Sequence, residues 1–303
     1  MQKSVEIIEV SPRDGIQNEK KRLSTATKLE LINRAIDAGA ARIEVTSFVN
    51  PKRVPQMADA DEVCAELRRD TDCKYIGLAL NRRGFERACN AELDEVNFVV
   101  VATDTFSQRN QGTDTETGMR MFNDLAREVT TPVGVGVTIA ASFGCPFEGE
   151  VSIDRFLEVV RGCMEANPFE LAIADTIGVA TPVDITQRVA AIRKEYPDIP
   201  LRLHLHNTRN TGIANAWAGV EAGVAALDSS FGGVGGCPFA PRATGNIATE
   251  DLVYMLERAG VHTGVDIDAA ISAANFVEAS LDKTVPGMVM KAGVFPQMID
   301  NAA

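Results

Sequence analysis

The chain has 303 residues, of which 45% are hydrophobic and 24% charged, and its formal net charge is −12. This mixture is typical of a globular protein and excludes a disordered chain, a collagen-like chain and a small disulfide-framed domain. Nonspecific nucleic-acid binding depends on lysine and arginine, so the acidic charge argues against it, although a few basic residues can still bind a small anion. No run of about 18 uncharged apolar residues occurs, and we expect no membrane-spanning segment.

The cysteines and the first residues bear on the cellular compartment. The six cysteines, at positions 64, 73, 89, 145, 163 and 237, include no Cys-x-x-Cys pair, and their spacing is not that of a disulfide framework. We therefore expect free thiols in a reducing compartment. Residues 1–6 lack the basic start and the apolar stretch of a secretory signal, so we expect a cytoplasmic protein.

Hydrophobic patterning predicts strands that alternate with helices along the chain. Strands are predicted near residues 5–10, 42–45, 74–80, 95–101, 133–140, 169–174, 201–206 and 224–228. Helices are predicted near residues 25–38, 56–67, 83–91, 116–129, 152–165, 182–195, 211–222 and 247–258. Strands that alternate with helices in this way form a parallel sheet through right-handed crossovers.

Eight strand–helix units favour a closed (β/α)8 TIM barrel, of class α/β, over an open doubly wound sheet. No Gly-x-Gly-x-x-Gly follows the first strand, which removes the main reason to expect a dinucleotide-binding sheet. No linker rich in proline, glycine or serine divides the chain. We predict a barrel catalytic domain over residues 1–260 and a helical extension over residues 261–303, whose helix near 266–281 covers part of one barrel face.

Chemistry in such a barrel takes place where the strands end, so polar residues at these positions are the candidates. Arg13 and Asp14 follow the first strand, and this pair is equally consistent with a surface ion pair beside a glycine turn. Glu44 lies inside the apolar second strand, where a carboxylate is costly to bury without a partner. Arg13 on the adjacent strand is a candidate for that partner.

The seventh strand carries the strongest single signal, the pair His204 and His206. Residues two apart in a strand point to the same face, so the two imidazoles lie side by side at the barrel mouth and are a good metal-binding pair. Two core histidines bonded to their neighbours are the alternative. Asp175 ends the sixth strand, where it either belongs to the site or caps the following turn.

A glycine-rich segment follows the eighth strand, over residues 231–246. Such a loop can bring its backbone close to a ligand and can close over it. Cys237 lies inside this segment, so its thiol is a candidate acid or base that closure would deliver. The alternative is a buried thiol with no role in the chemistry.

Several stretches, in order along most of the predicted barrel, resemble the 3-hydroxy-3-methylglutaryl-CoA lyases, a family of the metal-dependent pyruvate carboxyltransferase-like barrel superfamily. The matching stretches are Arg13–Lys20, Ile43–Val49, Val54–Asp59, Phe106–Asn110, Gly144–Phe147, Asp175–Gly178, His204–His206, Gly235–Ala240 and Gly245–Asp251. The resemblance implies a lyase that cleaves 3-hydroxy-3-methylglutaryl-CoA to acetyl-CoA and acetoacetate. It also implies an acyl-CoA substrate as the partner, without nucleic acid or membrane, and a homo-oligomer, most simply a dimer.

The resemblance also implies a role for each candidate residue. The implied ligands of a divalent cation, Mg²⁺ or Mn²⁺, are Asp14, His204, His206 and Asn246, a set of oxygens and imidazoles that suits these ions better than tetrahedral zinc. The implied catalytic residues are Arg13, which would stabilise the enolate oxygen, Cys237, which would be the catalytic thiol, and Glu44 and Asp175, which would orient these groups or assist proton transfer. The implied substrate-binding residues are Arg13, Gln17 and Thr176.

The chain departs from the family pattern at three places. Residues 207–210 read Asn-Thr-Arg-Asn where the family has Asp-Thr-Tyr-Gly, Phe239 stands where tyrosine is common, and Arg242 stands where a small or uncharged residue is usual. None of these changes removes a ligand, but Arg209 and Arg242 add positive charge near the mouth that can alter which acyl group is accepted. The alternatives are a lyase for citramalyl-CoA or a longer-branched 3-hydroxyglutaryl-CoA, a Claisen-condensing synthase, and a silent binder of CoA and metal.

Overall fold

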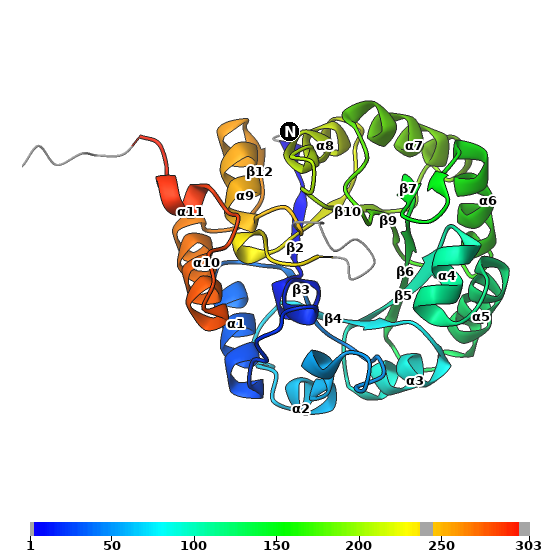
Figure 1. Ribbon diagram of the computed structural model, residues 1–303, viewed down its shortest axis with the longest axis horizontal. Coiled ribbons are helices and arrows are strands. Elements are labelled where there is room, and N and C mark those ends of the chain that lie inside the picture. Colours follow the sequence, from blue (N-terminus) through cyan, green and yellow to red (C-terminus); the bar gives the residue numbers. More distant parts are fainter. Residues whose placement is uncertain (1–2, 237–244, 297–303) are drawn as a thin grey trace, which may run out of the picture.

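Eight parallel strands form a closed barrel at the centre of the molecule, and helices surround it (Figure 1). The structure is a computed structural model that describes residues 3–236 and 245–296. The barrel strands are β2 (Glu6–Glu9), β3 (Arg42–Ser47), β4 (Lys74–Ala79), β5 (Glu95–Val101), β6 (Gly134–Ala140), β9 (Leu171–Asp175), β10 (Leu201–Leu205) and β11 (Ala226–Ser229). Their order around the barrel follows the chain, and β11 pairs with β2 to close it. The predicted TIM barrel is therefore confirmed.

Helices surround the barrel, and most of them bury an apolar face against it or against a neighbouring helix. They are α1 (Thr25–Asp37), α2 (Ala60–Ala65), α3 (Arg82–Asn90), α4 (Asp104–Gln111), α5 (Thr115–Glu128), α6 (Ile153–Met164), α7 (Pro182–Glu195), α8 (Gly212–Glu221), α9 (Thr249–Arg258), α10 (Ile267–Leu281) and α11 (Val289–Ala292). Several begin with a side-chain cap, and at α7 Thr181 and Asp184 form a reciprocal capping box that fixes its first turn. No helix in the two described ranges is long and apolar enough to cross a membrane.

The main hydrophobic core lies between the strands and the helices, whereas much of the barrel interior is ionic. Arg42 on β3 pairs inside the barrel with Glu95 and Glu170, and its Nη1 lies 3.1 Å from Glu6. Arg202 on β10 continues this cluster towards the mouth. Buried charges are costly unless each is paired, and here arginine forks meet carboxylates from several strands. The charged layer fills the barrel centre below the mouth.

The segment after α9 folds back onto the barrel beside α1 and α9 (Figure 1). The amide of Asp266 donates to the carbonyl of Ala38, and the amide of Gly287 donates to the carbonyl of Gly232. A short strand β12 (Val261–His262) also pairs with β1 (Lys3–Ser4) outside the barrel. The division into a domain over 1–260 and an extension over 261–303 stays a prediction.

Some boundaries differ from the predicted ones. The helix predicted over 56–67 is shorter, because a 3-10 turn, Pro55–Met57, precedes α2. Between them Asp59 accepts from the Thr25 hydroxyl and pairs with the buried Lys28 on α1, which holds this residue outside a regular helix. Helix α4 and the small hairpin of β7 (Gly144–Cys145) and β8 (Gly149–Glu150) were not predicted, because they are short insertions without a clear hydrophobic period.

Candidate active site

The first strand leads directly into the site through a tight π-helical turn, Ser11–Gly15. Pro12 is the second residue of this turn, and Gly15 fits against Ser230, whose Oγ would lie 2.7 Å from a β-carbon at residue 15. A side chain larger than hydrogen would therefore push the turn away from the strand β11 end. The turn places the side chains of Arg13 and Asp14 at the barrel mouth, where both are buried.

Three of the four predicted metal ligands converge at this mouth. His204 Nε2 lies 3.2 Å from His206 Nε2, and these nitrogens lie 3.9 and 4.0 Å from Asp14 Oδ2. Ligand atoms of all three residues fall within 4.8 Å of one another, and this is the one such group among the described residues. The spacing suits a cation between the three side chains, because each metal–ligand bond is about 2.0–2.6 Å long.

The fourth predicted ligand, Asn246, is brought to the same point by two glycines. Gly235 and Gly245 adopt the positive φ values of 131° and 108°, and their backbones approach so closely that a β-carbon at residue 245 would lie 2.5 Å from the Gly235 carbonyl oxygen. This approach sets Asn246 beside the turn, where its Nδ2 donates to Asp14 Oδ2 at 2.8 Å. Only glycine tolerates both the conformation and the contact.

The donor set fits a hard divalent cation. It combines one carboxylate, two imidazoles and one amide, which is the mixture of oxygens and nitrogens that Mn²⁺ accepts and Mg²⁺ tolerates. Asn246 Oδ1 is buried and has no hydrogen-bond partner among the described residues, although burying such an acceptor is costly. A bound cation would satisfy this oxygen. The residues present therefore fit the implied metal.

The site holds two of the predicted ligands, Asp14 and His206, in the forms that bind metals. Burial, together with the charge of His204, lowers the pKa of His206 to about 4, so its imidazole is neutral at physiological pH. Burial alone would raise the pKa of Asp14, but the charges of Arg13 and the two histidines hold it far below its usual range. An ionised carboxylate and a neutral imidazole are the states from which no proton has to be displaced.

The imidazole of His204 is held from behind by a residue that the sequence reasoning did not select. On β11, Asp228 Oδ2 forms a hydrogen bond of 2.9 Å with His204 Nδ1. Burial alone would lower the pKa of His204, but this hydrogen bond and the charges of Asp14 and Asp228 raise it. The bond directs the opposite nitrogen, Nε2, towards the metal position, as carboxylates behind metal-binding histidines commonly do.

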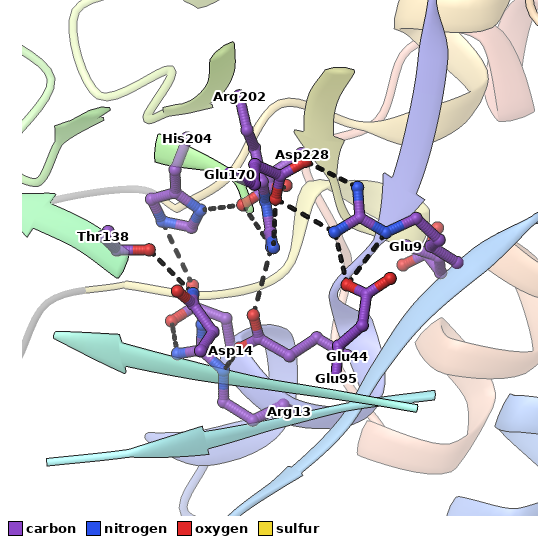
Figure 2. A network of polar contacts seen from close by, with 12 residues as sticks. Glu9, Arg13, Asp14, Glu44, Glu95, Thr138, Glu170, Arg202, His204 and Asp228 are labelled. Carbon is purple, nitrogen blue, oxygen red and sulfur yellow. Dashed lines mark hydrogen bonds and ion pairs between the residues drawn. The ribbon is translucent and has the colours of Figure 1, made fainter. Parts of the chain in front are cut away.

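Arg13 and Glu44 lie together, as predicted from their adjacent strands. The Arg13 guanidinium pairs through Nε with Glu44 Oε1 and through Nη1 with Asp14 Oδ1. The second Glu44 oxygen accepts from Arg202 Nη2 at 3.1 Å. Figure 2 shows these residues as one connected network with Asp228 and His204. Both oxygens of Glu44 are thus engaged by guanidinium groups.

A pocket opens above this network, with about 840 Å³ of empty space when its open mouth is included. Gln17 and Thr176, the predicted substrate-binding residues, both line it. The wall formed by β4, β5 and β6 is largely apolar, with residues such as Leu78 and Val99, but it also carries Asn97 and Thr138. Asn97 Nδ2 donates to Thr138 Oγ1 at 2.7 Å. The pocket therefore combines an ionic side, which carries the candidate metal ligands, and an apolar side with one polar pair.

Asp175 is placed differently from the other candidates. Its two oxygens accept from the amides of Val179 and Ala180, so its carboxylate ties together the turn after β9. Arg209, one of the departures from the family pattern, donates to the carbonyls of Ile177 and Gly178 and strengthens the same turn. Cys237, Phe239 and Arg242 lie outside the described residues. The catalytic roles of Asp175 and Cys237 stay predictions.

Asp228 and Arg202 are the functional candidates that sequence reasoning missed. Arg202 stands two residues before His204, so alternation along the strand places both on the inner face. This position was a usable signal, because a charged residue facing a barrel interior needs a partner. Asp228 is the last residue but one of β11, and the carboxyl end of a barrel strand is the position expected of site residues in this fold.

Comparisons with known proteins agree with this geometry. The HMGL-like family description matches residues 4–277. The chain is 42% identical to an (R)-citramalyl-CoA lyase of Chloroflexus aurantiacus, over 99% of this chain and 98% of that protein. It is 38% identical to the human mitochondrial hydroxymethylglutaryl-CoA lyase, over 96% of this chain and 90% of that protein.

Solved structures give the same result. An HMG-CoA lyase from Acinetobacter baumannii, in complex with coenzyme A and 3-methylmalate, superposes with a TM-score of 0.93 at 37% identity, over 97% of each chain. An enzyme described as hydroxymethylglutaryl-CoA lyase from Pseudomonas aeruginosa superposes with a TM-score of 0.91 at 38% identity, over 96% of this chain and 98% of that one. The chain therefore belongs to the HMGL-like family and is a carbon–carbon lyase.

Proposed function

We propose that the protein is a divalent-metal-dependent lyase that cleaves 3-hydroxy-3-methylglutaryl-CoA to acetyl-CoA and acetoacetate. The observation that carries this proposal is the convergence of Asp14, His204 and His206 beside the Arg13 guanidinium at one end of a single pocket. A 3-hydroxyacyl thioester needs both groups, because one end must lose a hydroxyl proton while the other accepts negative charge. We also propose that the protein is cytoplasmic, forms a homodimer and requires Mg²⁺ or Mn²⁺.

Asp14, His204, His206 and Asn246 would hold the cation. When bound, a divalent cation supplies Lewis acidity to substrate oxygens, which makes the 3-hydroxyl proton easier to remove. The protein contributes the fixed geometry. Asp228 orients the His204 imidazole. Gly235 and Gly245 set the position of the Asn246 amide.

Arg13 would stabilise the thioester oxygen. The C3 hydroxyl gives its proton to solvent water in the open pocket, and its oxygen becomes the ketone oxygen as the C2–C3 bond breaks. The electron pair of that bond moves towards the thioester carbonyl and forms an enolate. The pairs with Asp14 and Glu44 use Nη1 and Nε of Arg13, so neither uses Nη2. A preorganised donor of this kind contributes about 3–4 kcal/mol to transition-state stability in related oxyanion sites.

Glu44 and Cys237 would have different parts in the reaction. Both Glu44 oxygens are held by guanidinium groups, which supports a role in orienting Arg13 rather than in proton transfer. The enolate carbon has to receive a proton, and the position of Cys237 within the glycine-rich segment supports its thiol as the donor.

Cleavage of citramalyl-CoA to acetyl-CoA and pyruvate is the second candidate, because a relative with that name is 42% identical over nearly the whole chain. Product analysis decides between the two. Purified protein with Mg²⁺ or Mn²⁺ is incubated with each acyl-CoA, and the released keto acid is identified by mass spectrometry. We expect acetoacetate from the first substrate. Release of pyruvate alone would favour the second, and release of neither would contradict both.

Metal dependence is tested by substitution with a matched control. We expect His204→Ala and Asp14→Ala to lower Mn²⁺ content and abolish turnover without unfolding, because mouth residues contribute little to barrel stability. The third histidine, His262, is exposed on β12 and lies 3.6 Å from Glu257, far from the cluster in the fold. His262→Ala should keep wild-type metal content and activity. Normal metal content in the first two variants would contradict the assigned ligands.

A further inference from the structure

We propose that Arg202 is a positioning residue that fixes a metal-binding imidazole and the Arg13 guanidinium relative to each other. The inference deepens the proposed function and rests on it, because it concerns how that site is held. Arg202 does not line the pocket itself. It lies below the site inside the barrel, and its side chain is only 2% exposed.

The Arg202 guanidinium lies between two carboxylates that belong to different halves of the site (Figure 2). Its Nε donates to Asp228 Oδ1 at 2.5 Å, and its Nη2 donates to Asp228 Oδ2 at 2.9 Å. The same Nη2 donates to Glu44 Oε2 at 3.1 Å. One planar group therefore sets the distance and the orientation of both carboxylates.

Through Asp228, Arg202 acts on the metal side. Asp228 Oδ2 also bonds to His204 Nδ1, so the carboxylate is shared between the guanidinium and the imidazole. With two arginine donors on the carboxylate, its rotation is restricted, and the His204 ring is directed towards Asp14 and His206. A loosely held carboxylate would let the ring turn and would weaken the cation site.

Through Glu44, Arg202 acts on the side that accepts negative charge. Glu44 Oε1 pairs with Arg13 Nε, while Oε2 is held by Arg202. Rotation of the Glu44 carboxylate would therefore move the Arg13 guanidinium relative to the substrate oxygen. Since both arms start from one guanidinium, a displacement of Arg202 is transmitted to both groups.

Lysine cannot replace arginine in this position. Its single ammonium has no planar fork, so it cannot make the paired bonds to Asp228 while it also reaches Glu44. Arg42 provides an internal comparison, because it is a second buried arginine of the same ionic interior. It pairs with Glu95, Glu170 and Glu6, and its hydrogen bonds do not include Asp228 or Glu44. Among the described residues the two arginines share only Glu170, whose Oε2 lies 3.8 Å from Arg202 Nη1.

The test compares Arg202→Lys with Arg42→Lys in the full-length protein. Mn²⁺ affinity is measured by isothermal titration calorimetry without acyl-CoA, steady-state kinetics give kcat and KM, and circular dichroism gives the melting temperature. We expect Arg202→Lys to weaken Mn²⁺ binding by about 10–100-fold and to lower kcat more than it raises KM. Both variants should lower the melting temperature by a similar amount, but Arg42→Lys should keep wild-type Mn²⁺ affinity.

A second variant keeps the proposal testable if Arg202→Lys does not fold. Asp228→Asn preserves the size of the side chain and should reproduce the loss of Mn²⁺ affinity, and in a folded double variant the two losses should not add, because both act through one hydrogen bond. Wild-type Mn²⁺ affinity in either single variant, or equal losses in Arg202→Lys and Arg42→Lys, would overturn the proposal. Wild-type protein that binds Mn²⁺ but cleaves no acyl-CoA would contradict the proposed function, while the affinity comparison would still decide the role of Arg202.

Discussion

Replacing Glu9 by glutamine should change how the stability of the protein depends on pH. Glu9 is buried on the outer side of β2, where its Oε1 accepts from the amides of Ser11 and Phe231 at 2.8 and 3.2 Å. Its Oε2 accepts from the Thr249 hydroxyl at 2.6 Å. Burial outweighs these hydrogen bonds and raises the pKa of Glu9 from 4.5 to about 7.

The sign of the effect follows from proton binding. Between pH 4.5 and about 7 the folded protein keeps a proton on Glu9 that the unfolded chain has lost, so the free energy of unfolding falls as the pH rises through this range. The shift corresponds to about 3 kcal/mol, a contribution that is fully present below pH 4.5 and lost above about pH 7. Glutamine resembles the protonated form: its amide would donate to Thr249 Oγ1, and the Thr249 hydroxyl hydrogen would then turn to Ser229 Oγ, which lies 2.9 Å away.

Urea unfolding at pH 5 and pH 8.5, followed by circular dichroism and by the single tryptophan, Trp217, measures the effect. We expect Glu9→Gln to gain up to about 3 kcal/mol relative to the wild type between the two pH values. Glu116→Gln, at an exposed position of α5, is the matched control and should follow the wild type. Equal pH dependence in Glu9→Gln and the wild type would show that burial does not protonate this carboxyl.

Four further predictions concern the site. Arg13→Gln should lower kcat by about 10²–10⁴ with a much smaller change in KM, and steady-state kinetics in which only KM changes would make Arg13 a binding residue instead. Gly235→Ala should lower Mn²⁺ affinity at least about tenfold in calorimetry, because its β-carbon would lie 2.5 Å from Asn246 Nδ2. Unchanged affinity would contradict the role of Gly235 in placing Asn246. Thr138→Val should keep Mn²⁺ affinity but lower kcat/KM about tenfold, because the buried Asn97 amide at the pocket wall loses its hydrogen-bond acceptor. Unchanged kinetics would show that the Asn97–Thr138 pair does not contribute to substrate binding. Cys237→Ser should keep metal binding and lose most of kcat. Bound acyl-CoA should slow alkylation of the wild-type thiol, as mapped by mass spectrometry. Normal turnover of the serine variant would show that another group gives the enolate carbon its proton.

Local sequence patterns were sufficient for the barrel and for part of the site. Each strand–helix unit carries its own hydrophobic period, so the eight units could be predicted one at a time. His204 and His206 could be paired because alternation along one strand puts both on the same face. The contact of Arg13 with Glu44 followed from adjacent strands, and the structure places them together.

Contacts across the barrel could not be predicted in the same way. Asp228 reaches His204 only because β11 pairs with β10, and its carboxylate could equally have faced the loop. The layer around Arg42 joins four segments whose register is set by closure of the whole barrel. For Asp175 both readings were open from the sequence, and only the turn conformation shows that the amides of Val179 and Ala180 use its two oxygens.

The charged layer around Arg42 has a kinetic consequence, because it makes the pocket a dead end. Side chains fill the barrel centre beneath the site, so a ligand can enter and leave only between the loops at the mouth. If a cation at Asp14, His204 and His206 holds the reacting carbons of the proposed thioester, its nucleotide portion would occupy that exit and the keto acid would lie beneath it after cleavage. From this geometry we expect the products to depart in a fixed sequence, with acetyl-CoA first and the keto acid last, which product-inhibition kinetics can test.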